Sequence, residues 1–368
     1  MKTLQLVPAM EQGGVERGVV EVNRAIVAEG WENVVVSAGG RLVAEITAAG
    51  ARHVMLDVKS KNPLTYFTRA EKLRRILEAE RPDVVCVHSR VPAWLFLRAN
   101  RRLGIKWISF AHEANSISAY SAVMTRGDLV VTPSRYIASY LKENYRFDET
   151  RLRVIPRAID KKKFDVAGLD EDFMAKKRRE WGIEGKFTVM GLGRITALKG
   201  YDTLIKAVAS LDERFKLVIV GEAESLRKDV ERRLHDLVAR LGVGHRVVFA
   251  GNQRKVAECL RLADVVVSSN TRKAEAFGRS MAEALAMGRP VVSKAFGGAL
   301  DIVRDGIDGV LVRDGDFAAA IAKVSGMSFG DLRGEALERF SFEKMIERSL
   351  AVYRELAPAC VAAGKKVR

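Results

Sequence analysis

The sequence predicts an α/β protein built from parallel sheets with helices on both faces. Short runs of β-branched residues alternate with helix-length amphipathic segments almost from end to end, which is typical of strand–helix–strand units. The chain has 368 residues, of which 48% are hydrophobic and 29% are charged, as expected for a globular protein with two domains. No apolar run approaches the roughly 18 residues of a membrane span, so we expect no transmembrane segment.

The β-branched runs form two series, one in each half of the chain. Strands of the first series are expected at 4–7, 34–37, 53–56, 84–87, 107–110, 129–132 and 153–155. Strands of the second series are expected at 187–191, 216–220, 247–250, 265–268, 291–294 and 310–312. The interval 157–185 is rich in Lys and Arg, and we interpret it as the domain connection. Because open α/β sheets bind ligands at the carboxyl ends of their strands, we expect the chemistry in a cleft between the domains.

The cysteines and the N-terminus favour a cytoplasmic location. Cys86, Cys259 and Cys360 are far apart and show no ligand spacing, which favours reduced thiols. The apolar run at the N-terminus is interrupted at Glu11 and Gly13, too early for a signal peptide.

No metal or cofactor is expected. The five histidines form no HExxH or comparable pattern, which argues against a zinc site. Two Asp-x-Asp pairs occur, at 170–172 and 314–316, and such pairs can hold a divalent ion. We expect surface roles for both, with the second capping a helix after Phe317.

The net charge of +16 is unevenly distributed. Between residues 59 and 106 there are twelve Lys or Arg and four acids, so this segment supplies half of the excess. Such a concentration predicts an anionic partner. Nucleic acid is disfavoured because only 7% of the residues are aromatic and no binding motif is present. An anionic membrane surface or a lipid-linked, phosphorylated acceptor is favoured, and a solvated basic face is the alternative.

Glycines follow the first strand of each half. Gly13 and Gly14 precede a helix that begins near Val15, where a phosphate or sugar could approach the backbone. In the second half, a dinucleotide fingerprint would need a third glycine where Thr196 stands, which disfavours a dehydrogenase. The loop 191–200 instead carries Arg194 and Lys199, which could stabilise a departing diphosphate, or could be two solvated cations.

Two glutamates eight positions apart are the most informative feature of the chain. Glu275 lies just ahead of a predicted helix at 279–287, and Glu283 lies within it. One carboxylate could bind a sugar and the other a ribose, with a diphosphate at the helix N-terminus beside Phe277 and Gly278. The alternative is an ordinary amphipathic helix in which Glu283 faces water and the inward residues are Met281, Leu285 and Met287.

Four motifs, at 13–17, 193–200, 275–283 and 296–303, resemble those of glycosyltransferase family 4 in order and spacing. Segments 88–94 and 153–160 are similar to bacterial lipopolysaccharide core transferases, including mannosyltransferases. This resemblance implies the GT-B fold, with two Rossmann-like domains facing a cleft. An acceptor-binding domain at 1–160 and a nucleotide-sugar domain at 161–340 are then expected. The remaining segment, 341–368, would return to the first domain through a helix at 341–356.

The resemblance also implies the site. Arg194 and Lys199 would hold the donor diphosphate, Glu283 the ribose and Glu275 the sugar hydroxyls. The expected catalytic residues are His112, which matches the active-site histidine beside the transferred sugar, with Arg194, Lys199 and Glu275. The donor-binding set is completed by Gly13, Gly14, Gly193, Phe277 and Gly278.

The implied reaction is a metal-independent transfer that retains anomeric configuration. A hexose, mannose or glucose, would pass from a nucleotide diphosphate sugar to a lipopolysaccharide core or related glycolipid at the inner face of the cytoplasmic membrane. A sugar-nucleotide epimerase of the same architecture and a non-catalytic basic membrane or nucleic-acid binder are the alternatives. The chain departs from the family pattern at Val15, Arg157, Ala158 and Asp301, where Ala, Asn, Gly and Glu are common.

Overall fold

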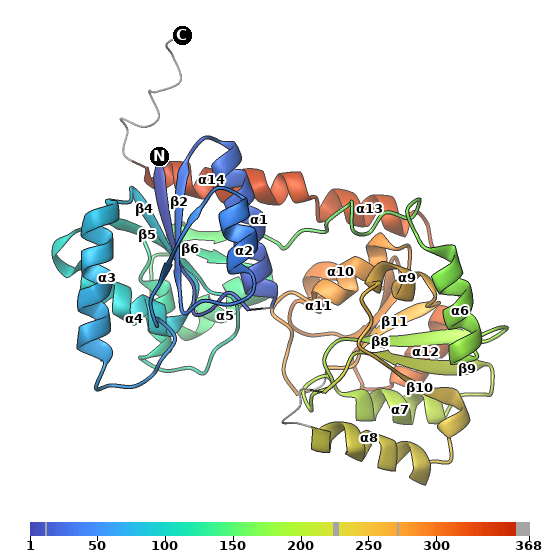
Figure 1. Ribbon diagram of the computed structural model, residues 1–368. Helices are drawn as coiled ribbons and strands as arrows, with labels where there is room; N and C mark the ends of the chain where they lie inside the picture. The colour runs from blue at the N-terminus through green and yellow to red at the C-terminus, as the bar shows by residue number, and fades with distance from the viewer. Residues whose placement is uncertain (12, 224–227, 271, 358–368) are drawn as a thin grey trace. The chain divides into compact units, whose positions relative to one another are not determined.

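A computed structural model describes residues 1–11, 13–223, 228–270 and 272–357 (Figure 1). The chain forms two compact units. Unit 1 comprises Met1–Arg157 together with the described residues from Glu343 onward, and unit 2 comprises Ala158–Phe342. Cys86 and Cys259 are buried free thiols, whereas Cys360 lies outside the described residues.

The described part of unit 1 is built on a seven-stranded parallel sheet with the order β3-β2-β1-β4-β5-β6-β7. Its strands are β1 (Lys2–Leu6), β2 (Glu32–Ser37), β3 (Arg52–Met55), β4 (Val84–Val87), β5 (Lys106–Phe110), β6 (Leu129–Thr132) and β7 (Leu152–Val154). Its helices are α1 (Gly14–Ala28), α2 (Val43–Ala48), α3 (Tyr66–Glu80), α4 (Arg90–Ala99), α5 (Arg135–Asn144) and α14 (Phe342–Leu356). Short 3-10 turns are η1 (Asn100–Arg102), η2 (Ser121–Thr125) and η3 (Glu149–Arg151).

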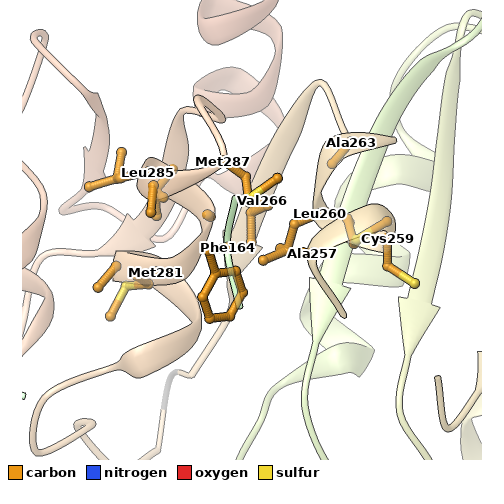
Figure 2. Close-up of a cluster of buried hydrophobic side chains, with 14 of the residues drawn as sticks. Phe164, Ala257, Cys259, Leu260, Ala263, Val266, Met281, Leu285 and Met287 are labelled. Atoms are coloured by element: carbon orange, nitrogen blue, oxygen red, sulfur yellow. The ribbon is translucent and has the colours of Figure 1, made fainter. Parts of the chain in front are cut away.

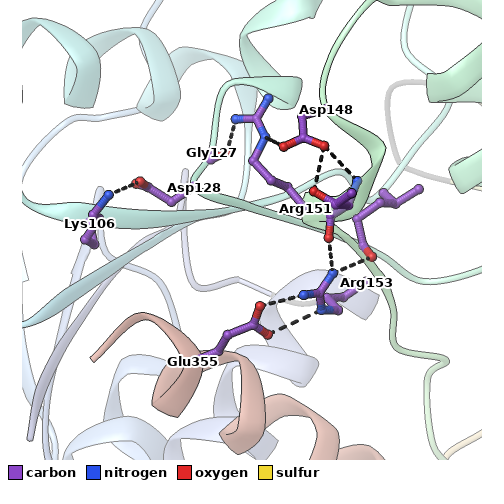
Figure 3. Close-up of polar contacts among 9 residues, drawn as sticks. Lys106, Gly127, Asp128, Asp148, Arg151, Arg153 and Glu355 are labelled. Carbon is purple, nitrogen blue, oxygen red and sulfur yellow. Dashed lines mark hydrogen bonds and ion pairs between the residues drawn. The ribbon is translucent and has the colours of Figure 1, made fainter. Parts of the chain in front are cut away.

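The last described helix, α14, packs on unit 1, although most of the chain before it belongs to unit 2. Met345, Leu350 and Tyr353 form its buried stripe. Glu355 of α14 accepts hydrogen bonds of 3.3 and 2.5 Å from the guanidinium of Arg153 in β7. Figure 3 draws this pair. The predicted return of the final helix to the first domain is therefore confirmed.

Unit 2 contains, among its described residues, a six-stranded parallel sheet with the order β10-β9-β8-β11-β12-β13. Its strands are β8 (Phe187–Leu192), β9 (Phe215–Val220), β10 (Val247–Gly251), β11 (Val265–Ser268), β12 (Val291–Lys294) and β13 (Gly309–Val312). Its helices are α6 (Glu171–Trp181), α7 (Tyr201–Ala209), α8 (Lys228–Arg240), α9 (Val256–Arg261), α10 (Arg279–Ala286), α11 (Ala299–Ile302), α12 (Phe317–Ser325) and α13 (Leu332–Arg339), with the 3-10 turn η5 (Gly244–Arg246).

Both faces of the unit 2 sheet are buried, which explains why its strands are continuous apolar runs. In β11, Val265 and Val267 point into the cluster formed with α7, α8 and α12. Val266, between them, points into the opposite cluster, which α6, α9, α10 and α13 complete. Figure 2 shows Val266 together with Leu260 of α9 and Met281 of α10 in this second cluster.

All thirteen predicted strands are present in the described residues, with ends that differ by no more than two residues, so the α/β fold is confirmed. The interpretation of 157–185 as a connection is wrong. Its described structure includes α6, and Phe164 and Trp181 are buried in the core of unit 2. The many cations of this segment lie between widely spaced apolar residues, and they obscured the buried stripe.

The two Asp-x-Asp pairs lie at helix starts. Asp170 accepts a hydrogen bond from the Phe173 backbone N–H at 2.8 Å and caps α6. Asp316 accepts one from the Ala319 N–H at 2.9 Å and caps α12, as predicted. Among the described residues, no cluster of three or more His, Cys, Asp or Glu side chains is placed to hold a metal ion. In the same residues no helix is both long and apolar enough to span a bilayer.

Candidate functional site

Each sheet reverses its strand order at one point, and polar residues follow the strands on both sides of that point. The reversal lies between β1 and β4 in unit 1 and between β8 and β11 in unit 2. Open α/β sheets bind ligands at the carboxyl ends of the strands at such a switch point. The two switch points are therefore the candidate ligand-binding sites.

In unit 2, the loop after β8 and the segment that follows β11 meet at an ion pair. The Lys199 ammonium contacts the Glu275 carboxylate, and both side chains are partly buried, with 27% and 20% exposed. The Asn270 side-chain amide donates to the same carboxylate oxygen at 3.2 Å. Ser269 donates to the Lys199 carbonyl at 2.9 Å, which attaches the cation-bearing loop to β11. The structure thus brings together Lys199 and Glu275, two predicted site residues that are 76 positions apart.

A glycine lets the Lys199 loop come this close to β11. Gly200 has a φ of +66°, and a Cβ at this position would lie 2.0 Å from the Ser269 carbonyl oxygen. Any side chain would therefore push the loop away from β11. The Tyr201 hydroxyl donates to the Gly193 carbonyl at 2.9 Å and closes the loop on itself. Burial and the negative charge of Glu275 raise the pKa of Tyr201, so its hydroxyl stays protonated as the donor.

The predicted helix at 279–287 is α10, and Gly278 caps it with a φ of +100°. Phe277 is buried in the core beside it, which fixes the chain as it enters the helix. The Glu275 carbonyl accepts a hydrogen bond of 2.8 Å from the Gly298 N–H, so the loop before α10 also rests on the 296–303 motif. These contacts hold Glu275 at the entrance to α10.

Glu283 lies on α10 and is mostly shielded from solvent. Its side chain is 17% exposed and lies 3.8 Å from Arg279, one turn earlier. If α10 were an ordinary amphipathic helix, its inward residues would be Met281, Leu285 and Met287, and all three are buried. Glu283, however, does not face water, so α10 is not a simple amphipathic helix with a solvated acidic face. Arg194 is exposed and lies in the same loop as Gly193 and Lys199.

In unit 1, the residues that follow β1, β4 and β5 line a cavity of about 260 Å³. Pro8 comes from the end of β1, His88 and Ser89 from β4, and His112 from β5. Arg90 and Glu113 supply its charges together with Glu16 of α1. Gly13 is the N-cap of α1 and Gly14 its first residue, and Gly13 offers no side-chain cap. This cavity has the polar lining and the location of a small-ligand site.

His112 belongs to a chain of polar groups in unit 1, in which Gln5 and His88 are buried and His112 and Arg157 are partly buried. Its Nδ1 lies 2.9 Å from a guanidinium nitrogen of Arg157, and its Nε2 lies 3.0 Å from Nδ1 of His88. The other ring nitrogen of His88 lies 3.2 Å from the side-chain oxygen of Gln5 in β1. The planes of the His88 and His112 rings are nearly parallel, with an interplanar angle of 7° and centroids 5.3 Å apart.

Both histidines are neutral in this environment. Burial, followed by the positive charge of Arg157, lowers the pKa of His88 to about 3. The same two causes, with a smaller contribution from His88, hold the pKa of His112 well below its ordinary value. Because both ring nitrogens of His112 already have hydrogen-bond partners, this ring is poorly suited to take a proton from a substrate.

Sequence reasoning did not select four of the residues that build these sites. Gln5, His88 and Arg157 were not among the predicted site residues, and neither was Asn270. One signal was available, because His88 and His112 each follow a strand of the same predicted sheet. Parallel neighbours end at the same edge, so the two rings could have been paired from the strand predictions.

Comparisons with known proteins identify the family. The model described as "Glycosyl transferases group 1" matches residues 173–332, and the model "Glycosyltransferase Family 4" matches residues 12–163. D-inositol 3-phosphate glycosyltransferase of Stackebrandtia nassauensis is 36% identical over 217 residues, which are 55% of this chain and 47% of that protein. The chain therefore spans about half the length of such curated relatives.

Solved structures show the same fold. A glycosyltransferase from Rickettsia africae has a TM-score of 0.87 and 28% identity, with 96% of this chain and 98% of that chain covered. HepE of Anabaena in complex with UDP-glucose has a TM-score of 0.80 and 19% identity, covering 96% and 100%. WaaG, involved in lipopolysaccharide biosynthesis, has a TM-score of 0.70 and 17% identity, covering 95% and 99%. With one family model on each half and this shared architecture, the chain belongs to the family 4 and group 1 glycosyltransferases, which have the GT-B fold.

Proposed function

We propose that this protein transfers a hexose, mannose or glucose, from a nucleotide diphosphate sugar to a lipopolysaccharide core or a related, phosphorylated glycolipid. The observation that carries the proposal is the partly buried pair of Lys199 and Glu275 at the switch point of unit 2. The Lys199 ammonium could bind the diphosphate of a nucleotide sugar, and the Glu275 carboxylate could accept hydrogen bonds from the sugar hydroxyls.

On binding, the donor would replace the contact between Lys199 and Glu275 with contacts of its own to each residue. In this structure Lys199 and Glu275 neutralise each other. A diphosphate would take over the Lys199 ammonium, assisted by Arg194 from the same exposed loop. Glu275 would then accept hydrogen bonds from sugar hydroxyls while Asn270 continues to orient its carboxylate. The solved HepE complex contains UDP-glucose, which supports a nucleotide sugar as the donor.

Glu283 would bind the ribose. Its carboxylate is largely shielded and lies beside Arg279, so it is oriented before a ligand arrives. A shielded carboxylate discriminates well between a ligand with a hydroxyl and one without, because an unsatisfied buried acceptor is costly.

The catalytic contribution of Lys199 and Arg194 would be to stabilise negative charge on the departing diphosphate. As the bond between the sugar and the phosphate breaks, the electron pair remains on the phosphate oxygen and positive charge develops on the sugar ring. Fixed cations that gain contact strength in this transition state lower the barrier. The acceptor hydroxyl would attack from the side that the diphosphate leaves and pass its proton to the departing phosphate oxygen, which retains configuration and needs no metal ion.

The acceptor would enter the unit 1 cavity. Arg90 lies on its wall, where a guanidinium suits a phosphate group. The name of the Stackebrandtia relative contains an inositol phosphate, and WaaG acts in lipopolysaccharide biosynthesis, which supports a phosphorylated or lipopolysaccharide acceptor. Segment 88–94, which resembles core transferases, begins where β4 ends and places His88 and Arg90 in the cavity wall.

The test measures release of nucleoside diphosphate by the purified protein from a panel of UDP, GDP and ADP hexoses, with and without lipopolysaccharide core acceptor. We expect acceptor-dependent release that survives EDTA, and a product with the anomeric configuration of the donor. Conversion of the donor to its epimer without acceptor would favour the epimerase alternative. Failure of every nucleotide sugar to raise the melting temperature would overturn the donor site.

The protein would work as a peripheral protein at the inner face of the cytoplasmic membrane. Within the basic segment 59–106, Arg74 and Arg75 pair with acids on α3, and the buried Arg69 is bonded to loop carbonyls. The remaining cations near α3 and α4 include Arg101 and Arg102, which line a groove with the 63% exposed Phe67. Cations beside an exposed aromatic ring suit an anionic lipid surface.

Flotation with anionic and neutral liposomes tests this attachment. We expect salt-sensitive binding to anionic vesicles only, weakened by Arg101→Ala together with Arg102→Ala. Lys323 lies on α12 of unit 2, and Lys323→Ala is the control that should bind as the unmodified protein does. Equal recovery with neutral and anionic vesicles would refute an electrostatic attachment.

A further inference from the structure

The polar chain of unit 1 starts from a group that can only donate. The guanidinium of Arg157 has no acceptor atom and keeps its proton at all relevant pH values. Its 2.9 Å contact with His112 therefore makes Nδ1 of that ring the acceptor. A neutral imidazole has one protonated nitrogen, so the proton of His112 must be on Nε2.

The same argument passes to the next ring. Nε2–H of His112 points at Nδ1 of His88 over 3.0 Å, so Nδ1 of His88 must be an acceptor. The proton of His88 is then on Nε2, which donates over 3.2 Å to the Gln5 side-chain oxygen. Along this path each N–H that faces the next member meets an acceptor, and the direction is the same throughout. The side-chain nitrogen of Gln5 lies off the path and is buried without a hydrogen-bond partner among the described residues.

We infer that Gln5 and His88 are positioning residues that hold His112 as the neutral tautomer protonated on Nε2, and that this tautomer orients Arg157. The other tautomer of His112 would present N–H to the Arg157 guanidinium, and two donors facing each other cost a buried hydrogen bond. Gln5 is the anchor of the chain because its amide oxygen accepts and cannot take up a proton.

The surroundings support a chain that does not titrate. Gln5 is fully buried and His88 is 8% exposed, and Phe110 stacks on the His88 ring at 4.7 Å. Burial lowers the pKa values of both histidines, which agrees with neutral rings. His88 lines the 260 Å³ cavity and also a second, smaller one, whose walls include Gln5, Arg157 and Tyr353. The other titratable or charged groups on these two cavities come from α1, α4, α14 and the segments after β5 and β7, and they are Glu16, Arg90, Tyr353, His112, Glu113 and Arg157.

The packing of Arg157 shows why its orientation needs support. A Cβ at Gly18 of α1 would lie 2.2 Å from a terminal nitrogen of this guanidinium, so the group occupies space that a glycine leaves open. His112 and His88 both line the 260 Å³ cavity, and the chain thus fixes one wall of it. The consequence for catalysis rests on the proposed function, in which this cavity takes the acceptor.

Side-chain ¹⁵N NMR of histidine-labelled protein tests the tautomers without any assay of activity. The signals of His88 and His112 are assigned with His88→Gln and His112→Gln. We expect both rings to be neutral and protonated on Nε2, with no titration between roughly pH 5 and pH 8. A His112 ring protonated on Nδ1, or one that gains a second proton in this range, would overturn the inference.

A matched pair of variants tests the link to turnover. Gln5→Glu places a carboxylate beside Nε2 of His88 and so favours a positively charged ring. A charged His88 presents a second donor to Nε2–H of His112 and breaks the chain, so kcat should fall roughly tenfold relative to the unmodified protein as the pH is lowered from about 8 to about 6. Gln5→Met has a similar size but no charge, and its activity relative to the unmodified protein should not depend on pH.

The outcomes separate this inference from the proposed function. The same pH-independent loss in both Gln5 variants would show a merely structural role and overturn the positioning inference, while acceptor-dependent release by the unmodified protein would still support the proposed function. If the unmodified protein releases no nucleoside diphosphate, the proposed function fails, and the NMR result still decides the tautomers.

Discussion

The two switch points have the same topology, but one holds a pair of charged groups and the other holds neutral groups. In unit 2 the end of β8 and the end of β11 bring a cation and a carboxylate into contact, and both remain partly exposed. In unit 1 the ends of β4 and β5 bring two neutral rings together on a buried glutamine. An ion pair that water can reach is easily opened by a charged ligand, whereas a neutral chain anchored on the buried Gln5 and His88 loses hydrogen bonds if it rearranges. The unit 2 site is thus suited to exchange charge, and the unit 1 site to keep its shape.

The largest effect is expected where charge is exchanged. Lys199→Ala should lower kcat by about 100-fold to 1000-fold, because the diphosphate loses a fixed cation while Glu275 keeps its full negative charge nearby. Release of nucleoside diphosphate at saturating donor measures this effect. Lys206 lies on the exposed face of α7, and Lys206→Ala is a control that should retain normal turnover. Similar rates for the two variants would remove Lys199 from the catalytic machinery.

The next largest effect concerns the backbone that carries the unit 2 cation. Gly200→Ala should destabilise unit 2 by about 3 kcal/mol, because left-handed strain adds to the clash with the Ser269 carbonyl. Gly185 has nearly the same φ, +68° against +66°, but a Cβ added there would meet no atom within 4 Å. Gly185→Ala should therefore cost only the strain, about 1 kcal/mol. Thermal unfolding measures both, and equal losses would mean that the Lys199 loop can move away from β11.

The architecture could be predicted from sequence because parallel strands that are buried on both faces are unmistakable. The run of valines at 265–267 has no polar alternation, and the structure divides its side chains between two cores. The 157–185 segment failed because Phe164 and Trp181 are sparse among cations, so the local pattern resembled a linker. Tertiary contacts, not local composition, bury these two residues.

The candidate site was predictable only in part, for a similar reason. Lys199 and Glu275 belong to motifs, whereas Asn270, which orients the Glu275 carboxylate, has no local pattern to mark it. The roles of His88 and Gln5 depend on a sequence of hydrogen bonds that begins at Arg157, and no spacing along the chain encodes such a direction. Motifs indicated which groups could carry charge, but not which neighbours constrain them.

An intermediate effect is expected on the pH dependence of stability, because the unit 1 chain contains neutral histidines and the unit 2 pair does not. Buried histidines with lowered pKa values are neutral when folded and take up protons when unfolded, so the unfolded state binds more protons below its pKa of about 6.5. The free energy of unfolding should consequently fall as the pH is lowered from about 6.5 towards the folded pKa, which for His88 is about 3. Each such histidine contributes up to about 1.4 kcal/mol per pH unit.

Denaturant unfolding at several pH values between about 7 and 5 measures this slope, above the range in which most carboxylates titrate. His88→Gln should lower the slope by an amount that corresponds to nearly one proton taken up on unfolding. If His88→Gln has the slope of the unmodified protein, the rings of unit 1 are not held neutral.

The smallest effect is expected at the ion pair of Arg153 and Glu355, which belongs to neither switch point. Arg153 and Glu355 tie α14 to β7, but their side chains are 36% and 42% exposed, so solvent screens them (Figure 3). A double-mutant cycle with Arg153→Ala and Glu355→Ala should give a coupling energy below about 1 kcal/mol. Thermal unfolding of the four proteins in low and high salt measures the coupling, which should shrink as salt is added. A larger, salt-independent coupling would mean that α14 is held by this pair, and not by the buried stripe around Tyr353.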